Sequence, residues 1–199
     1  MVRLSDRIYV CFILRNGQPH RVAPTRKYKR DVVMLLQRKK LRLENYDYSQ
    51  CNAYFVTLCT HNRQQLFGTI EPLPVGATLR GRPNNPDKMI EKWINELENK
   101  FYEVRIDCFC IMPDHLHLII VIQNRNGSGL EKIISWLKTM TTNEYIRGVK
   151  SGLFLPFENK VWQRSYYDHI IRDEQDLNEK RDYILTNPIR WLEKTSCPD

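Results

Sequence analysis

Residues 104–122 read VRIDCFCIMPDHLHLIIVI. Two largely apolar runs, 104–112 and 115–122, flank a Pro113-Asp114 pair, and β-branched and aromatic residues are frequent in both runs. Such runs suit a pleated, buried surface, and the Pro-Asp pair favours a turn. The pattern predicts an antiparallel hairpin in the middle of a sheet.

Two histidines interrupt the second run of this hairpin. Alternate side chains of a strand share a face, so His115 and His117 project together while Leu116 and Leu118 enter the core. Two imidazoles about 6 to 7 Å apart along a strand can converge on one cation. The alternative is a pair of polar residues on a solvated face, but the apolar character of the rest of the strand favours metal binding.

A structural zinc centre is a competing interpretation of the same hairpin. Cys108 and Cys110 would join His115 and His117 as ligands. A Cys-x-Cys pair on one strand lacks the knuckle turn that most short zinc motifs use. We therefore interpret the two cysteines as small core residues.

Upstream of the hairpin, the segment 54–60 is rich in aromatic and β-branched residues and predicts a strand. Residues 69–86 contain four prolines and two glycines, which predicts an exposed loop. A helix should follow, with Asn85 as N-cap and Pro86 at its first position. Its apolar stripe predicts a buried face made of Met89, Ile90, Trp93, Ile94, Leu97 and Phe101.

Downstream, residues 129–147 predict a second amphipathic helix, whose Lys132, Lys138 and Arg147 face either a phosphate or water. Its predicted buried side consists of Leu130, Ile133, Ile134, Leu137, Met140 and Ile146. Segments 161–163 and 166–171 predict short extended pieces. A last helix should begin after Asp173 as N-cap and end before Pro188.

The end of this last helix contains a second group of chemical interest. Tyr183 and Asn187 are four residues apart and therefore neighbours on one helical face. An amide oxygen beside a phenol could complete a metal shell with two imidazoles, leaving positions for water and phosphate. Such a shell suits Mg²⁺ or Mn²⁺ better than closed structural zinc.

The 199 residues with 42% hydrophobic content are enough for one domain with a terminal appendage. Residues 1–50 contain twelve Lys or Arg and four Asp or Glu, a surplus that equals the formal charge of +8 of the whole chain. This charge suggests a polyanionic partner, and a solvated basic face or a loose arm is an equal alternative. Within this segment, residues 8–14 predict a strand and residues 31–43 a basic helix.

Two further features concern the compartment. The six cysteines are scattered without a Cys-x-x-Cys pair, which favours reduced thiols and a cytoplasmic location. The early apolar run 8–14 is too short for a membrane span, so no membrane association is expected.

The order of these motifs resembles the single-tyrosine HUH transposases, which are IS200-like, and in particular their REP-associated branch. The resemblance spans about residues 42–193. Its motifs are residues 45–49, 54–57 and 66–68, then Met112-Pro113-Asp114-His115-Leu116-His117, Trp162-Gln163, residues 167–172, Tyr183-Ile184 and Asn187-Pro188. Insertion-sequence relatives usually have Gln at the last ligand position, so Asn187 favours the REP-associated branch.

The resemblance implies an α+β fold, with a central antiparallel β-sheet and helices packed on its faces, in the manner of a ferredoxin-like palm. It implies a catalytic domain over residues 44–195, preceded by a basic N-terminal extension, residues 1–43. It also implies His115, His117 and Asn187 as ligands of Mg²⁺ or Mn²⁺, and Tyr183 as the nucleophile.

The implied activity is cleavage and joining of single-stranded DNA, presented as hairpins of a palindromic repeat, through a 5′-phosphotyrosine. Trp162, Arg164, His169 and Arg172 are candidate DNA contacts. A monomer is expected rather than a homodimer. Two alternatives stay open: a catalytically idle nucleic-acid-binding protein on the same scaffold, and a metal-dependent phosphohydrolase that uses activated water.

Overall fold

The computed structural model describes residues 46–73, 76–80, 86–124 and 127–195. The expected strand 8–14, the expected helix 31–43, the basic extension 1–43 and the Asn85 N-cap lie outside these residues. The described elements are β1 (Asn52–Cys59), a 3₁₀ turn η2 (His61–Arg63), β2 (Thr69–Leu73), β3 (Gly76–Arg80), α1 (Pro86–Lys100), β4 (Val104–Ile111), β5 (His115–Ile122), α2 (Leu130–Lys150), β6 (Tyr167–Ile171), α3 (Glu174–Leu185) and α4 (Asn187–Thr195).

The main sheet is antiparallel, with strand order β4-β5-β1-β6. The predicted hairpin 104–122 is confirmed as β4 and β5. Its expected place in the middle of the sheet is wrong, because β6 pairs with the far side of β1 and leaves β4 at one edge of this sheet. The register of β1 on β5 places Thr57 opposite His117 and Cys59 opposite His115.

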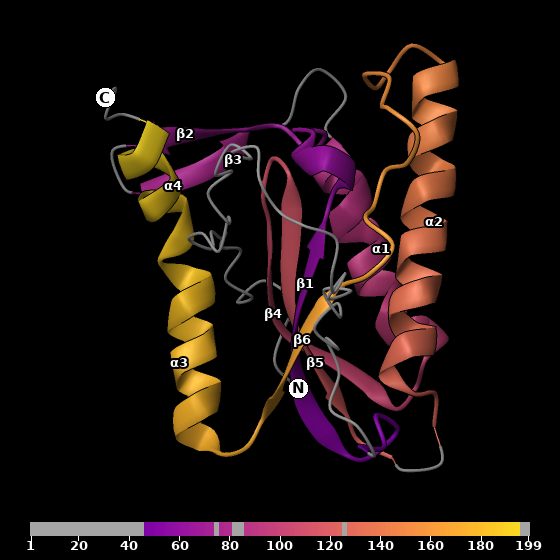
Figure 1. Ribbon diagram of the computed structural model, residues 1–199, viewed down its shortest axis with the longest axis vertical. Helices are drawn as coiled ribbons and strands as arrows, with labels where there is room; N and C mark the ends of the chain where they lie inside the picture. Colours follow the sequence, from indigo (N-terminus) through magenta and orange to yellow (C-terminus); the bar gives the residue numbers. More distant parts are fainter. Residues whose placement is uncertain (1–45, 74–75, 81–85, 125–126, 196–199) are drawn as a thin grey trace, which may run out of the picture.

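Helices cover both faces of the main sheet, with α1 and α2 on one side and α3 and α4 on the other (Figure 1). The first face holds the larger core cluster, which contains Leu116, Leu118 and Ile120 of β5. The second face holds a smaller cluster with Phe55, Ile119 and Ile184, against which Tyr183 and Trp191 pack. The fold is therefore α+β in three layers, as the sequence predicts.

An irregularity in β4 changes which of its residues face the larger core cluster. Ile106 and Phe109 both join the larger cluster although they are three positions apart, and the pairing with β5 shifts between them. Beyond the shift, Cys110 and Met112 enter the smaller cluster. The extra residue in β4 reverses its alternation, as a β-bulge does.

The helix boundaries largely match the expected capping signals. Pro86 is the first residue of α1, where its missing N–H costs no hydrogen bond. Asp173 caps α3 and accepts a hydrogen bond from the Asp176 N–H at 2.8 Å. However, α3 is not the last helix, because α4 starts at Asn187 with Pro188 in its first turn. Proline ends one helix and is well tolerated at the start of the next.

Two further expectations need correction. Residues 69–86 are not simply a loop, since β2 and β3 pair as a two-stranded antiparallel ribbon that contacts α4. The proline-rich composition hides this ribbon, because a two-stranded ribbon leaves room for proline outside the hydrogen-bonded ladder. In α2 the buried face includes Thr141 and Tyr145, in place of Met140 and Ile146. Among the described residues, no helix is long and apolar enough to cross a membrane.

Candidate active site

The two histidines of β5 lie on the sheet face that α3 and α4 cover. Only 2% of His115 and 0% of His117 is exposed. Their ring centroids are 4.9 Å apart and the ring planes are nearly perpendicular, at 89°. The alternation of the strand therefore brings both imidazoles to one buried position, as the sequence predicts.

Each imidazole uses its Nδ1 atom in a contact with a neighbouring side chain. Thr57 Oγ1 lies 2.7 Å from His117 Nδ1, and a carboxylate oxygen of Asp114 contacts His115 Nδ1. The Nε2 atom of each ring is also buried. When Nδ1 is used in this way, Nε2 is the nitrogen through which a histidine binds a metal.

Burial holds His117 in its neutral form. Its pKa lies well below the usual value for histidine because of desolvation first, with the neighbouring His115 and Arg63 acting in the same direction. The His117 ring also stacks on Phe55, with 5.3 Å between centroids and 15° between planes. A neutral imidazole retains the lone pair that a metal ligand needs.

Tyr183, in the last turns of α3, places its ring against the same histidine. Its centroid lies 6.0 Å from that of His117 and 5.6 Å from that of Phe55, edge-on in both cases. Desolvation raises the pKa of the Tyr183 phenol, as does the nearby Tyr167, whereas Arg190 acts in the opposite direction. The phenol is therefore protonated at neutral pH and needs help to become a nucleophile.

Asn187 is fully buried where α3 passes into α4. Its side-chain amide donates a hydrogen bond to the Tyr183 carbonyl, which leaves Oδ1 as the ligand-type atom of that side chain. Four residues further on, Trp191 contacts the His115 ring at 6.4 Å between centroids. In the sequence, Asn187 is thus four residues after Tyr183, whose ring contacts His117, and four residues before Trp191, whose ring contacts His115.

Comparisons with known proteins match the chain to one family. The family model described as "Transposase IS200 like" matches residues 47–187. The chain belongs to the IS200-like transposase family. An uncharacterized protein of Haemophilus influenzae is 33% identical over 167 residues, covering 77% of this chain and 89% of that protein.

Other relatives of this IS200-like transposase carry more specific names. A putative REP-associated tyrosine transposase of Haemophilus influenzae is 31% identical over 107 residues, covering 49% of this chain and 60% of the relative. A REP-associated tyrosine transposase solved bound to a REP hairpin shares the fold, with a TM-score of 0.51 and 18% identity over 75% of this chain and 73% of that one.

The competing zinc centre does not form. Both cysteines are core residues, as expected, since Cys110 is buried in the smaller core cluster and Cys108 packs against it. Cys110 is disulfide-bonded, however, so the expectation of reduced thiols is wrong for this residue. Cys108 is a free thiol whose pKa is raised to about 12 by desolvation first and by the adjacent Asp107. Within the part of the chain that the structure describes, no group of three or more His, Cys, Asp or Glu side chains is placed to hold a metal.

Trp162 is not a candidate DNA contact. Only 5% of it is exposed, its indole N–H donates to Thr141 Oγ1 at 2.9 Å, and its ring packs on Phe67. Aromatic side chains can stack on bases, which is why Trp162 was a candidate, but this tryptophan is part of the core. Lys138 also has an internal role, since its ammonium group donates to the backbone carbonyls of Gln163, Arg164 and Ser165.

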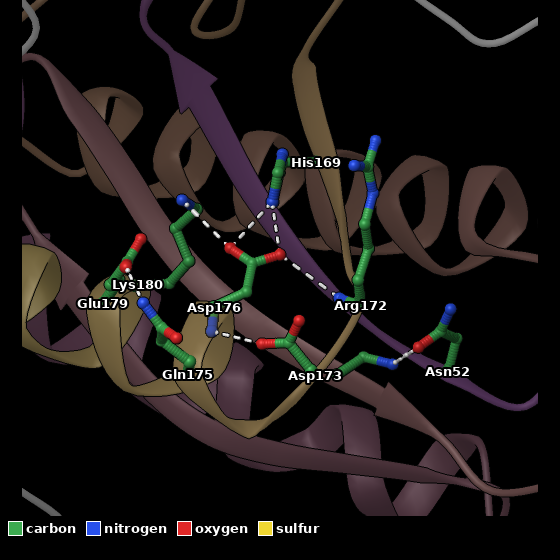
Figure 2. Close-up of polar contacts among 9 residues, drawn as sticks. Asn52, His169, Arg172, Asp173, Gln175, Asp176, Glu179 and Lys180 are labelled. Atoms are coloured by element: carbon green, nitrogen blue, oxygen red, sulfur yellow. Dashed lines mark hydrogen bonds and ion pairs between the residues drawn. The ribbon is translucent and has the colours of Figure 1, made fainter.

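His169 connects β6 to the start of α3. Its Nε2 atom lies 2.8 Å from an Asp176 carboxylate oxygen, and Lys180 and the Arg172 N–H contact the same carboxylate (Figure 2). This network holds α3, and with it Tyr183, against the edge of the sheet. Of the four predicted DNA contacts, Arg164 and Arg172 are exposed.

Three residues that contact the histidine pair were not predicted from the sequence, namely Thr57, Phe55 and Trp191, and Asp114 was predicted only as part of the turn. Thr57 and Phe55 stand in a predicted strand, but only the register of β1 on β5 places them beside His117. Asp114 immediately precedes His115, so the contact between these two side chains could have been predicted from their adjacency in the sequence. Trp191 carried no such signal, because α4 was not predicted.

Proposed function

We propose that this chain is a metal-dependent endonuclease and strand transferase for single-stranded DNA, acting on hairpins of repetitive palindromic sequence. Tyr183 would attack a phosphodiester and form a 5′-phosphotyrosyl enzyme. The bond between phosphorus and the 3′ oxygen breaks, and that oxygen leaves as a free 3′-hydroxyl after gaining a proton. A second 3′-hydroxyl can reverse the step, so strands can be joined without ATP.

The observation that carries this proposal is the position of Tyr183 beside the imidazole pair. The two buried histidine rings lie 4.9 Å apart, the Tyr183 ring is edge-on to His117, and Asn187 is buried one helical turn after Tyr183. Packing alone would fill such an interface with apolar residues at lower cost. Convergence of polar groups with matching chemistry supports a catalytic site.

The donor set fits a divalent cation that shares its shell with phosphate. His115, His117 and Asn187 offer two imidazole nitrogens and one amide oxygen, all without negative charge. Such a set leaves positions for phosphate oxygens and suits Mg²⁺ or Mn²⁺. A bound cation would withdraw charge from the non-bridging oxygens of the scissile phosphate.

The other residues of the site prepare the nucleophile. Phe55 contacts both His117 and Tyr183, so it sets the spacing between the two rings. Since burial raises the pKa of the phenol, its proton has to leave as the phosphorus–oxygen bond forms. Arg190 favours the phenolate electrostatically, as its effect on the Tyr183 pKa indicates.

A hairpin substrate is supported by the family and by the REP-hairpin complex of a structural relative. The exposed Arg164 and Arg172 are the remaining candidates for phosphate contacts. A monomer is expected to suffice, because one chain brings Tyr183 to His117.

The decisive experiment uses two neighbouring tyrosines as a matched pair. Tyr167 contacts the same Phe55 ring but lies on the exposed edge strand. Labelled hairpin single strands are incubated with Mn²⁺ and protein, then separated on denaturing gels. We expect a covalent adduct with the unmodified chain and with Tyr167→Phe, and none with Tyr183→Phe.

The other outcomes separate the alternatives. Cleavage that persists in Tyr183→Phe without an adduct would indicate a hydrolase that uses water. Hairpin binding without cleavage by the unmodified chain would indicate an idle nucleic-acid-binding protein. An adduct that moves to Tyr167 would refute the assigned nucleophile.

A further inference from the structure

The carboxylate of Asp114 lies between a buried histidine and an arginine. One oxygen contacts His115 Nδ1 and the other lies 3.4 Å from Arg63 Nη1. The Asp114 side chain is only 11% exposed, whereas that of Arg63 is 47% exposed. Asp114 therefore joins the solvent-facing arginine to the interior of the candidate active site.

The Asp114–His115 and Thr57–His117 contacts differ in whether they fix the tautomer of the histidine. An ionised carboxylate can only accept hydrogen bonds, so the Asp114 contact requires a proton on His115 Nδ1 and leaves the lone pair on Nε2. A hydroxyl both donates and accepts, so Thr57 is compatible with either tautomer of His117. Of these two contacts, the one from Asp114 alone sets which nitrogen of its histidine can bind a cation.

The backbone around Asp114 is held from β1 and the turn after it. Thr60 donates to the Asp114 carbonyl twice, from its N–H and from its hydroxyl, each at 2.9 Å. Asn62 and Arg63 then adopt left-handed conformations, with φ of 53° and 55°. Two consecutive non-glycine residues in this region are unfavourable by themselves, and such geometry is retained where the surroundings fix it. Here it accompanies the approach of Arg63 to the carboxylate.

We propose that Asp114 is a positioning residue for the metal: its carboxylate fixes His115 as the Nδ1–H tautomer, so that Nε2 faces the ion, and Arg63 holds the carboxylate in place. The inference rests on the proposed function. It also gives the site a negative charge adjacent to a neutral donor set, which increases its affinity for a divalent cation. Carboxylate partners of metal-bound histidines act in this way.

The first measurement is the affinity of the full chain for Mn²⁺ alone. The concentration of free Mn²⁺ is read from its electron paramagnetic resonance signal during the titration. We expect Asp114→Ala to weaken binding by about 10- to 100-fold. Asp114→Asn keeps the shape and one acceptor but loses the charge, so its loss should be smaller. Arg63→Met removes the ion pair with Asp114 and should weaken Mn²⁺ binding by only a few-fold, because Arg63 is half exposed.

The second measurement is the tautomer of His115 in the metal-free chain, from nitrogen-15 NMR of its imidazole. We expect Nδ1–H in the unmodified chain and a mixture in Asp114→Asn. Asp107→Asn is the matched control, because Asp107 also pairs with an arginine, Arg181 at 2.5 Å, but on β4 beside α3. It should leave both the Mn²⁺ affinity and the His115 tautomer unchanged.

The outcomes distinguish this inference from the function on which it rests. Unchanged Mn²⁺ affinity in all Asp114 and Arg63 variants, together with loss of binding in His115→Ala, would overturn the positioning role alone. Unchanged binding in His115→Ala and His117→Ala would overturn the metal site itself. An Nε2–H tautomer of His115 in the unmodified chain would also overturn the positioning role.

Discussion

The Tyr183 ring meets the His117 ring edge-on, with 6.0 Å between their centroids, inside a single chain. The contact joins α3 to β5 across the smaller core cluster. It places the proposed nucleophile beside a proposed metal ligand within one chain.

The first prediction concerns this single-chain arrangement. A mixture of Tyr183→Phe and His117→Ala chains should form no covalent adduct with hairpin DNA, because neither chain contains a complete site. The measurement is a denaturing gel of the mixture beside each chain alone. Recovery of about a quarter or more of the normal adduct would instead indicate a dimer that shares its sites.

The second prediction concerns metal removal. A chelator should stop cleavage, and Mn²⁺ should restore it, whereas hairpin binding should persist because exposed arginines supply it. Mn²⁺ at about 100 times its dissociation constant should also stabilise the fold by about 2.7 kcal/mol. Calorimetry should show this stabilisation in the unmodified chain and not in His115→Ala. Equal stabilisation of both chains would place the ion elsewhere.

The third prediction separates packing from DNA contact among the residues near β6. Trp162→Phe should lower the free energy of unfolding by about 1 to 3 kcal/mol, because it removes buried volume and the hydrogen bond to Thr141. Its hairpin affinity should stay normal under conditions where it is folded.

Arg164→Ala is the counterpart of Trp162→Phe, because it should weaken DNA binding without lowering stability. Its free energy of unfolding should stay within about 0.5 kcal/mol of that of the unmodified chain. The slope of the logarithm of the single-strand binding constant against the logarithm of the salt concentration should become shallower by about 0.7. Titrations at several salt concentrations check this. A normal slope in Arg164→Ala would remove Arg164 from the DNA interface.

The fourth prediction concerns the pH dependence of stability at the start of α3. Burial acts to raise the pKa of Asp176, but its contacts with His169, Lys180 and the Arg172 N–H lower it overall (Figure 2). A lowered folded-state pKa gives stability that is present above the unfolded value, about 3.9, and lost as pH falls through the folded value. Asp176→Asn should therefore destabilise the fold by about 1 kcal/mol at pH 7, and this difference should shrink below about pH 4.

Urea unfolding at pH 7 and pH 3 checks this effect. Asp173→Asn is the control in the same turn, because asparagine caps a helix about as well as aspartate. It should change stability little at either pH. An equal loss at both pH values for Asp176→Asn would show that the carboxylate charge does not contribute.

Local patterns were sufficient for most of the elements. The alternation around His115 and His117 predicted their common face, and Asp173 and Pro86 predicted two helix starts. The ribbon β2–β3 was not predictable in this way, because prolines in residues 69–86 resemble a loop whenever the pairing partner is unknown. Likewise, Pro188 signals the end of α3 equally well whether the chain then becomes irregular or begins α4.

The amino-acid sequence by itself determined the α+β class, the hairpin and the choice of candidate site residues, because these follow from periodicity, capping and motif order. Only the tertiary structure decided that Trp162 belongs to the core, that Thr57 and Asp114 contact the two histidines, and that Tyr183 contacts His117. Those relationships depend on strand register and helix packing. Both are set by the burial of whole faces rather than by any local stretch of residues.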